Sequence, residues 1–287
     1  MTGGPDIFAG QPSDPDLLAE IYDIEHDQIV EDLAFYREMT RRARGAVLDL
    51  GCGSGRLFEA FLRGGAPRVV GVDGSPALLR RARRRIRRSP TLSSASEDGR
   101  LQLVEADVTE LRRSDRFSLV VAVGMLPHLS GPPAALKLLR VARRRLTKAG
   151  RLVIDDLGPG MLPSADLPLS VDWRRRLRGR PLVRYSQLMR EERADGLHVA
   201  FSTLVERTQP DGTIARLPAS HRLWYPSSDG LARLVRQAGM TVELTYGSHD
   251  LEPLNRDSER IIVVARRAPV DVSERSGRSR SVAPQAG

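Results

Sequence analysis

The stretch Val47-Leu48-Asp49-Leu50-Gly51-Cys52-Gly53-Ser54-Gly55-Arg56 joins a short apolar run to three alternating glycines. Residues 46–50 predict a buried strand, and residues 56–62 predict the helix that follows it. Glycines in such a turn let a ligand approach the backbone beside a helix N-terminus. The stretch therefore predicts a ligand-binding loop between the first strand of a sheet and its helix.

Strand and helix patterns alternate on the C-terminal side of this loop. Apolar runs at residues 68–72, 101–104, 117–123 and 152–154 read as strands. Helical spacing of apolar residues separates several of them, and the helix with Ala135 to Leu146 on one face is expected to end at Gly150. Two more strands at residues 240–246 and 260–265 complete the pattern. The fold class is therefore α/β, a doubly wound, mostly parallel sheet of seven strands.

Acidic residues end the first two strands of this sheet. Asp49 precedes the glycine loop, and Asp73 ends the second strand, where an acid commonly binds two ribose hydroxyls. Arg56 stands where the dinucleotide fingerprint requires its third glycine. A carboxylate at Asp49 would also disfavour a pyrophosphate and favour a ligand with an ammonium or sulfonium charge. S-adenosylmethionine carries both.

Three motifs in order resemble those of the class I S-adenosylmethionine-dependent methyltransferases. They are residues 47–56, residues 71–76 (Gly-Val-Asp-Gly-Ser-Pro) and residues 104–108 (Val-Glu-Ala-Asp-Val). The resemblance implies that Asp49 and Gly51 lie near the methionine end of the cofactor and that Asp73 holds the ribose. It also implies that Asp107 reaches the adenine amino group and that Val108 packs on the ring. Further cofactor contacts expected on this basis are Cys52, Gly53, Gly55, Arg56, Gly74, Val123, Tyr22 and Tyr36.

Residue patterns organise the rest of the chain. Residues 17–43 are helical and amphipathic, and in the resembling family a Tyr-Asp pair in such a segment folds over the cofactor. Short alternating runs with turn residues at 181–225 predict an inserted antiparallel β lid over the acceptor, and a helix at 231–238 with the last two strands completes the core. Both ends, rich in Gly, Pro, Ser or charged residues, are expected to be disordered. The expected boundaries are 1–13 and 269–287 for the ends, 14–44 for the helical cover, 45–162 for the cofactor-binding core, 163–226 for the lid and 227–268 for the C-terminal part.

Three residues are candidates for the chemistry. His128 follows the buried strand 117–123, beside the region where ligands bind in open α/β sheets, and an imidazole can act as a base near pH 7. Small-molecule N-methyltransferases of the amino-sugar kind resemble this stretch. His249 follows a later strand and is a second candidate. Tyr22, in a Tyr-Asp pair that the family resemblance also covers, is a third, because aromatic faces attract cations.

Composition limits the other possibilities. The chain has 287 residues, a net charge of +9 and 45 basic residues, of which only Lys137 and Lys148 are lysines. We interpret this arginine bias as genome composition, with the runs at 80–88 and 140–145 as solvated helix faces and the run at 174–180 as a possible contact for an acidic or phosphorylated substrate. The single cysteine, Cys52, excludes a disulfide framework, a radical-type iron–sulfur site and a separate cysteine nucleophile.

These observations favour a cytoplasmic S-adenosylmethionine-dependent methyltransferase of secondary metabolism, without a metal, that acts on a small-molecule amine or hydroxyl. No apolar run is long enough to span a membrane and the N-terminus lacks a signal pattern, so no membrane partner is expected. A homodimer is possible, and nucleic acid is not the expected partner. Two alternatives stay open: an RNA or protein methyltransferase that uses the arginine-rich surface, and a non-catalytic cofactor-binding partner subunit.

Overall fold

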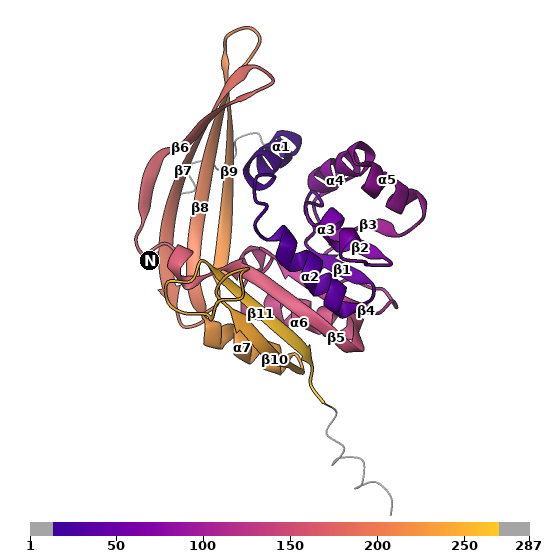
Figure 1. Cartoon of the computed structure of the whole chain (residues 1–287). Coiled ribbons are helices and arrows are strands. Elements are labelled where there is room, and N and C mark those ends of the chain that lie inside the picture. The colour runs from indigo at the N-terminus through magenta and orange to yellow at the C-terminus, as the bar shows by residue number, and fades with distance from the viewer. Residues whose placement is uncertain (1–13, 270–287) are drawn as a thin grey trace, which may run out of the picture.

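The computed structural model describes residues 14–269 and places a seven-stranded sheet at their centre (Figure 1). The strand order is β3-β2-β1-β4-β5-β11-β10. Neighbours from β3 to β5 run parallel, and β11 is antiparallel to both of its neighbours. This arrangement confirms the predicted doubly wound, mostly parallel α/β fold. The expectations for residues 1–13 and 270–287 lie outside the described residues.

Six of the seven strands match the apolar runs of the sequence closely, whereas β5 extends well beyond the predicted run 152–154 at both ends. Their bounds are β1 Val47–Leu50, β2 Val69–Asp73, β3 Leu101–Glu105, β4 Phe117–Val123, β5 Leu146–Leu157, β10 Met240–Tyr246 and β11 Arg260–Arg267. The central strands are buried because helices cover both faces of a doubly wound sheet. This is why they read as continuous apolar runs and not as alternating ones.

Two helical layers cover the sheet. One face packs against α2 (Leu33–Ala43), α3 (Phe58–Arg63), α4 (Pro76–Arg88) and α5 (Pro90–Glu97). The other face packs against α6 (Pro132–Arg145) and α7 (Ser228–Gln237). The helix expected to run to Gly150 ends at Arg145 instead, because Leu146 is extended and already pairs with Phe117. Gly150 therefore lies inside β5.

A separate antiparallel sheet of four strands rises from one end of the core (Figure 1). Its strands are β6 Leu167–Leu177, β7 Arg180–Arg193, β8 Gly196–Thr208 and β9 Ile214–Tyr225. The short helix η1 (Leu126–His128), which follows β4, lies against β9. The base of this sheet therefore reaches the carboxyl ends of the core strands, where the glycine loop also lies.

Helix α1 (Pro15–His26) connects the antiparallel sheet to the core (Figure 1). Its Leu17 and Ile21 pack on Leu182, Val205 and Leu217 of that sheet. Asp14 caps its first turn by accepting from the backbone N–H of Leu17 at 3.0 Å. The N-terminal helical stretch expected from the sequence is thus two helices, α1 and α2, separated by residues 27–32.

The opposite side of α1 carries acids that pair with the arginines of α4. Arg81 Nε lies 2.5 Å from Asp23 Oδ2, Arg80 pairs with Asp16 at 2.9 Å, and Arg85 pairs with Asp27. The expectation that the arginines of the run 80–88 form a solvated face is therefore wrong for Arg81 and Arg85, which are partly buried, while Arg80 stays exposed. They hold α1 against the core.

Candidate active site

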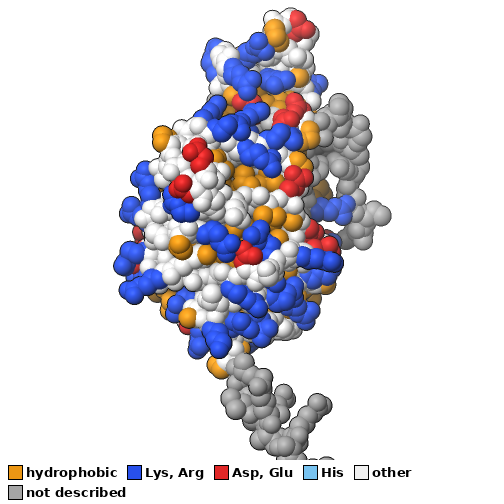
Figure 2. Space-filling view, turned by 90° about the vertical axis from the view of Figure 1, so that its right-hand side faces the viewer, with side chains coloured by type: hydrophobic (Ala, Val, Ile, Leu, Met, Phe, Trp, Pro, Cys, Tyr) orange, Lys and Arg blue, Asp and Glu red, His pale blue; other side chains and the backbone are white. Residues whose placement is uncertain are grey.

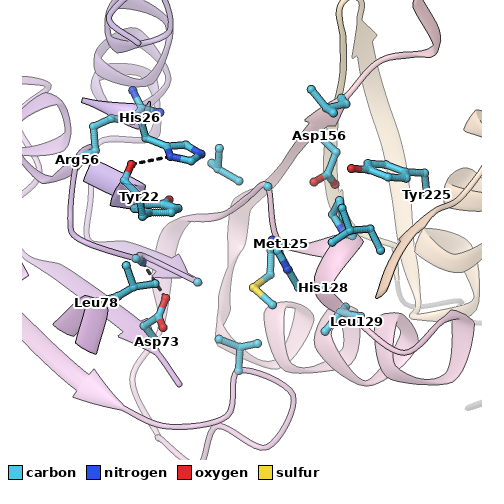
Figure 3. Close-up of a pocket in the computed structure, with 18 of the residues that line it drawn as sticks. Tyr22, His26, Arg56, Asp73, Leu78, Met125, His128, Leu129, Asp156 and Tyr225 are labelled. Atoms are coloured by element: carbon cyan, nitrogen blue, oxygen red, sulfur yellow. Dashed lines mark hydrogen bonds between the residues drawn. The ribbon is translucent and has the colours of Figure 1, made fainter. Parts of the chain in front are cut away.

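A large cavity opens at the carboxyl ends of the parallel strands, the edge at which ligands bind in such sheets. Its volume is about 1670 Å³. Figure 3 shows Tyr22, Arg56 and Asp73 on one side of it, Asp156 and Tyr225 on the other, and Met125 and His128 between. We call the side with Tyr22, Arg56 and Asp73 the loop side, and the side with Asp156 and Tyr225 the β9 side.

The glycine loop forms the wall of the loop side. Gly51 has φ +80°, and a Cβ there would lie 2.4 Å from the sulfur of Met125. Gly55 has φ +78°, and its Cβ would lie 2.3 Å from the ring of Phe58. Side chains at either position would be strained and would clash, so the sequence needs glycine to form this tight loop.

Asp73 is held in a fixed orientation beside the loop. Its Oδ2 accepts from the backbone N–H of Gly53 and its Oδ1 accepts from that of Ser75, both at 2.8 Å. Asp73 and Gly74 line the cavity. The carboxylate has further lone pairs beyond these two bonds, so it can still accept hydrogen bonds from a ligand.

The third motif continues the same wall. Asp107 and Val108 line the cavity, and Asp107 accepts from the backbone N–H of Thr109 at 2.7 Å. Val108 is buried. The structure therefore brings Gly51, Gly53, Asp73, Gly74, Asp107, Val108 and, from β4, Val123 into one surface.

Four of the predicted cofactor residues do not line the cavity: Asp49, Cys52, Gly55 and Tyr36. Cys52 packs in the core behind the loop, and burial raises the pKa of its thiol. Tyr36 is fully buried, and its hydroxyl donates to Asp155 at 2.5 Å. These side chains support the wall from behind and do not form its surface.

Asp49 lies under the loop as a buried carboxyl group. Burial raises its pKa to about 7, and the negative charge of Asp73 adds to the shift while Arg56 opposes it. A positive charge placed near the loop would favour the ionised form of this carboxyl group.

Arg56 lines the cavity and anchors the segment between α1 and α2. Its two terminal nitrogens bind Asp32 at 2.7 and 2.6 Å, and one of them also donates to the carbonyl of Ile29 at 2.9 Å. This bidentate pair satisfies the charge of Arg56 within the protein. Arg56 therefore positions the N-terminal segment over the cavity.

Tyr22 enters the loop side from α1. Its ring stacks on that of His26 with centroids 3.9 Å apart, and both residues line the cavity (Figure 3). Burial raises the pKa of the Tyr22 hydroxyl to about 12, so the phenol stays neutral. Tyr22 can therefore present an aromatic face or a hydroxyl to a ligand, and it does not act as a base at neutral pH.

His128 stands between the two sides, at the end of η1. It is accessible through the cavity, but surrounding protein atoms still lower the pKa of its imidazole, and the neighbouring His221 adds to the effect. The two rings lie 6.3 Å apart in an edge-to-face arrangement. His221, which was not among the residues predicted for the site, also lines the cavity.

His249 lines the cavity but is part of a polar network beneath it. Its Nε2 donates to Asp155 Oδ2 at 2.8 Å, and Arg260 donates twice to Asp155 Oδ1, at 2.8 and 2.6 Å. With the hydroxyl of Tyr36, the fully buried Asp155 accepts four hydrogen bonds. Burial alone would raise the pKa of Asp155, but the bond from His249 and the charge of Arg260 lower it.

Asp156 lines the β9 side and was missed by the sequence reasoning. It is 4% exposed, and among the described residues neither of its carboxyl oxygens has a hydrogen-bond partner. Two consecutive acids at the carboxyl end of an apolar strand, Asp155-Asp156, are the signal that could have found it, since such strand ends had already been assigned to the site.

The arginine run 174–180 lies away from the cavity wall. Arg175 donates to the carbonyl of Ile24 at 2.7 Å, and Arg178 pairs with Glu20 at 2.8 Å, both on α1. Figure 2 shows Lys and Arg side chains spread over the whole of one face and interspersed with acids. Within residues 14–269, no group of three or more His, Cys, Asp or Glu side chains is placed to hold a metal ion.

Comparison with known proteins agrees with this geometry. A family model described as a methyltransferase domain matches residues 47–150, which hold the glycine loop, Asp73, Asp107 and His128. The match therefore covers the part of the chain that carries the three sequence motifs. The resemblance found in the sequence motifs is thereby confirmed.

Curated relatives of the methyltransferase domain include the tRNA U34 carboxymethyltransferase of Shewanella sp. (strain ANA-3), which is 36% identical over 111 residues. That match covers 39% of this chain and 31% of the relative, so the chain spans about a third of the relative's length. No helix among the described residues is long and apolar enough to cross a membrane.

Solved structures share the whole fold. A sugar N-methyltransferase of Streptoalloteichus sp. superposes with a TM-score of 0.69 at 19% identity, covering 94% of this chain and 99% of that one. An amino pentose methyltransferase of Micromonospora echinaspora, solved with S-adenosylmethionine bound, gives a TM-score of 0.62 at 21% identity, covering 86% and 97%. At these identities the likeness shows the fold, which extends beyond the methyltransferase domain to the antiparallel sheet.

Proposed function

We propose that the chain is an S-adenosylmethionine-dependent methyltransferase whose acceptor is a small-molecule amine of natural product biosynthesis. The observation that supports this most strongly is that one cavity joins the glycine loop and Asp73 to His128. The loop side would hold the cofactor and the β9 side the acceptor. The two solved neighbours, which act on sugars or amino sugars, agree with this acceptor class.

The residues of the loop side fit S-adenosylmethionine. Asp73 can accept hydrogen bonds from ribose hydroxyls, Asp107 from an adenine amino group, and Val108 offers an apolar surface to the ring. Asp49 favours positive charge near the loop, and the aromatic face of Tyr22 does the same from α1. The bound cofactor would supply a methyl group carried on a sulfonium.

His128 is our candidate for the general base. Its lowered pKa keeps the imidazole neutral at pH 7, so it can take a proton from an acceptor ammonium group. An amine must lose that proton before its lone pair can attack. His249 is the weaker candidate because its Nε2 is already bound to Asp155.

An RNA acceptor is the second candidate, favoured by the tRNA-modifying relatives and by the net charge of +9. Against it, Arg81, Arg85, Arg175 and Arg178 are engaged by α1. These contacts leave less of the arginine surface for a nucleic acid than the composition alone indicates.

Two measurements on the full chain test the proposal. Calorimetry with S-adenosylhomocysteine should show binding that weakens in Asp73→Asn and is unchanged in the control Asp98→Asn, an exposed acid distant in the fold. Labelled S-adenosylmethionine should then transfer methyl groups to members of a panel of amino sugars, amino acids and total tRNA. Transfer to tRNA alone would select the second candidate, and binding without transfer to any acceptor would favour a non-catalytic subunit.

A further inference from the structure

Asp156 is a buried carboxyl group that has no hydrogen-bond partner within residues 14–269. It faces the cavity from β5 with 4% of its surface exposed, and neither oxygen has a hydrogen-bond partner among the described residues. Burying such a group is costly unless something binds it. The adjacent Asp155, with four hydrogen bonds, shows how this protein satisfies a buried acid where no ligand is involved.

The two aspartates differ because consecutive strand residues point to opposite faces of a sheet. Asp155 points beneath α2, where Tyr36, His249 and Arg260 meet it. Asp156 points to the side of β9. The guanidinium of Arg260 is bound to Asp155, so no cation of the described part of the chain is bonded to Asp156.

The surroundings of Asp156 suit a positively charged ligand. Figure 3 shows its carboxyl group facing the hydroxyl of Tyr225, a buried residue of β9 that also lines the cavity. The charged or titratable groups that influence Asp156 are Asp155, which adds negative charge, and Arg260, which opposes it. Burial raises the pKa of the Tyr225 hydroxyl to about 12, and the negative charge of Asp156 adds to this shift.

We propose that Asp156, with the hydroxyl of Tyr225, binds a protonated amino group of the acceptor and selects cationic amines over neutral alcohols. The inference rests on the proposed function for its biological meaning, because the β9 side is where an acceptor would lie. The carboxylate supplies a charge-assisted hydrogen bond, and the tyrosine hydroxyl can accept another.

The test compares two probes of the same shape, cyclohexylamine and cyclohexanol, by saturation-transfer NMR titration of the full chain. The titrations are run with and without saturating S-adenosylhomocysteine. The wild type should bind the amine at least about tenfold more tightly than the alcohol, the scale of one charge-assisted hydrogen bond. Asp156→Asn should reduce the ratio to about one, and Tyr225→Phe should reduce it in part.

The control is Glu259→Gln, which removes an exposed carboxylate from the same cavity and should keep the wild-type ratio. Calorimetry in buffers of different ionisation enthalpy supplies a second readout. Burial raises the pKa of Asp156 to about 8, so binding of the amine at pH 7 should release a proton, and this release should vanish in Asp156→Asn.

A wild type that fails to bind cyclohexylamine, or binds both probes equally, overturns the proposal, as does an Asp156→Asn variant that keeps the preference. The proposed function is judged separately. If S-adenosylhomocysteine does not bind while the amine preference depends on Asp156, the methyltransferase assignment fails and the amine subsite stands.

Discussion

Replacing Asp155 or its neighbour Asp156 by asparagine should change the free energy of unfolding in opposite directions. Asp155→Asn leaves Arg260 and His249 without their buried counter-charge and puts an amide N–H₂ among three donors. Asp156→Asn instead removes a buried acid that has no partner. The first should destabilise the fold, and the second should stabilise it at neutral and alkaline pH.

The magnitudes follow from the contacts and from the pKa. Breaking a buried ion pair by removing one partner costs about 3–5 kcal/mol, which we expect for Asp155→Asn. The pKa of Asp156 is raised from 3.8 to about 8. The folded state therefore holds a proton that the unfolded state releases, and each pH unit in this window lowers the free energy of unfolding by about 1.4 kcal/mol.

The carboxyl group of Asp156 is thus most favourable below pH 4 and loses that advantage as the pH rises to about 8. By pH 7 the loss amounts to about 4 kcal/mol, against about 1–3 kcal/mol for burying the amide that replaces it. The net gain in Asp156→Asn should be close to zero at pH 5 and about 2–4 kcal/mol at pH 8, because three pH units at about 1.4 kcal/mol each separate the two conditions.

Urea unfolding followed by the fluorescence of Trp173 and Trp224 measures these values at pH 5 and pH 8. The reasoning is refuted if the two variants change the free energy of unfolding in the same direction at pH 8. It is also refuted if the effect of Asp156→Asn does not depend on pH. Tyr36→Phe, which removes one of the four bonds to Asp155, should cost less than Asp155→Asn.

Three further predictions concern the cavity. Asp73→Ala should weaken S-adenosylhomocysteine binding by about 1.5–3 kcal/mol, and calorimetry giving the wild-type affinity for a folded variant would remove Asp73 from the cofactor site. His128→Ala should keep that affinity and lower turnover about 10²–10⁴-fold, with partial recovery in His128→Asn if the ring mainly orients the acceptor; a wild-type pH–rate profile would assign His128 to packing. Arg81→Met should speed hydrogen exchange of residues 15–26 while the exposed control Arg83→Met does not, and equal protection in both variants would show that the Arg81–Asp23 pair does not hold α1.

Much of the sheet could be predicted because its signals are local. A continuous apolar run such as Phe117–Val123 marks a strand buried on both faces, and both its ends were predicted correctly. The ends of helices were harder to predict from the sequence. Gly150 is a good helix terminator in isolation, but the pairing of Leu146 with Phe117 across the sheet ends α6 earlier. Tertiary contacts of that kind leave no trace in the helical periodicity.

The residues of the site also differ in whether local sequence signals could predict them. The loop side came from three motifs whose residues are close in sequence, and the structure gathers Asp73, Asp107 and Val108 in one wall. The β9 side depends on contacts between distant segments, such as His128 with His221, and no local pattern encodes them. Tyr36 was predicted to contact the cofactor but lies in the core. From sequence alone, an aromatic residue at helical spacing could not be assigned to the core or to the cavity.

Helix α1 links the two sides of the cavity physically. It places Tyr22 over the glycine loop, binds α4 through Asp16, Asp23 and Asp27, and packs on the antiparallel sheet through Leu17 and Ile21. The base of that same sheet carries His221 and Tyr225. The Arg80–Asp16 and Arg85–Asp27 pairs are partly exposed, and such pairs weaken with salt, whereas apolar packing does not. If α1 were to detach from α4, it would therefore stay with the antiparallel sheet, and the loop side would open while the β9 side kept its shape. In this chain several arginines of a strongly basic composition thus pair with acids of α1 and help to close the cavity, so these arginines have a structural role within the protein.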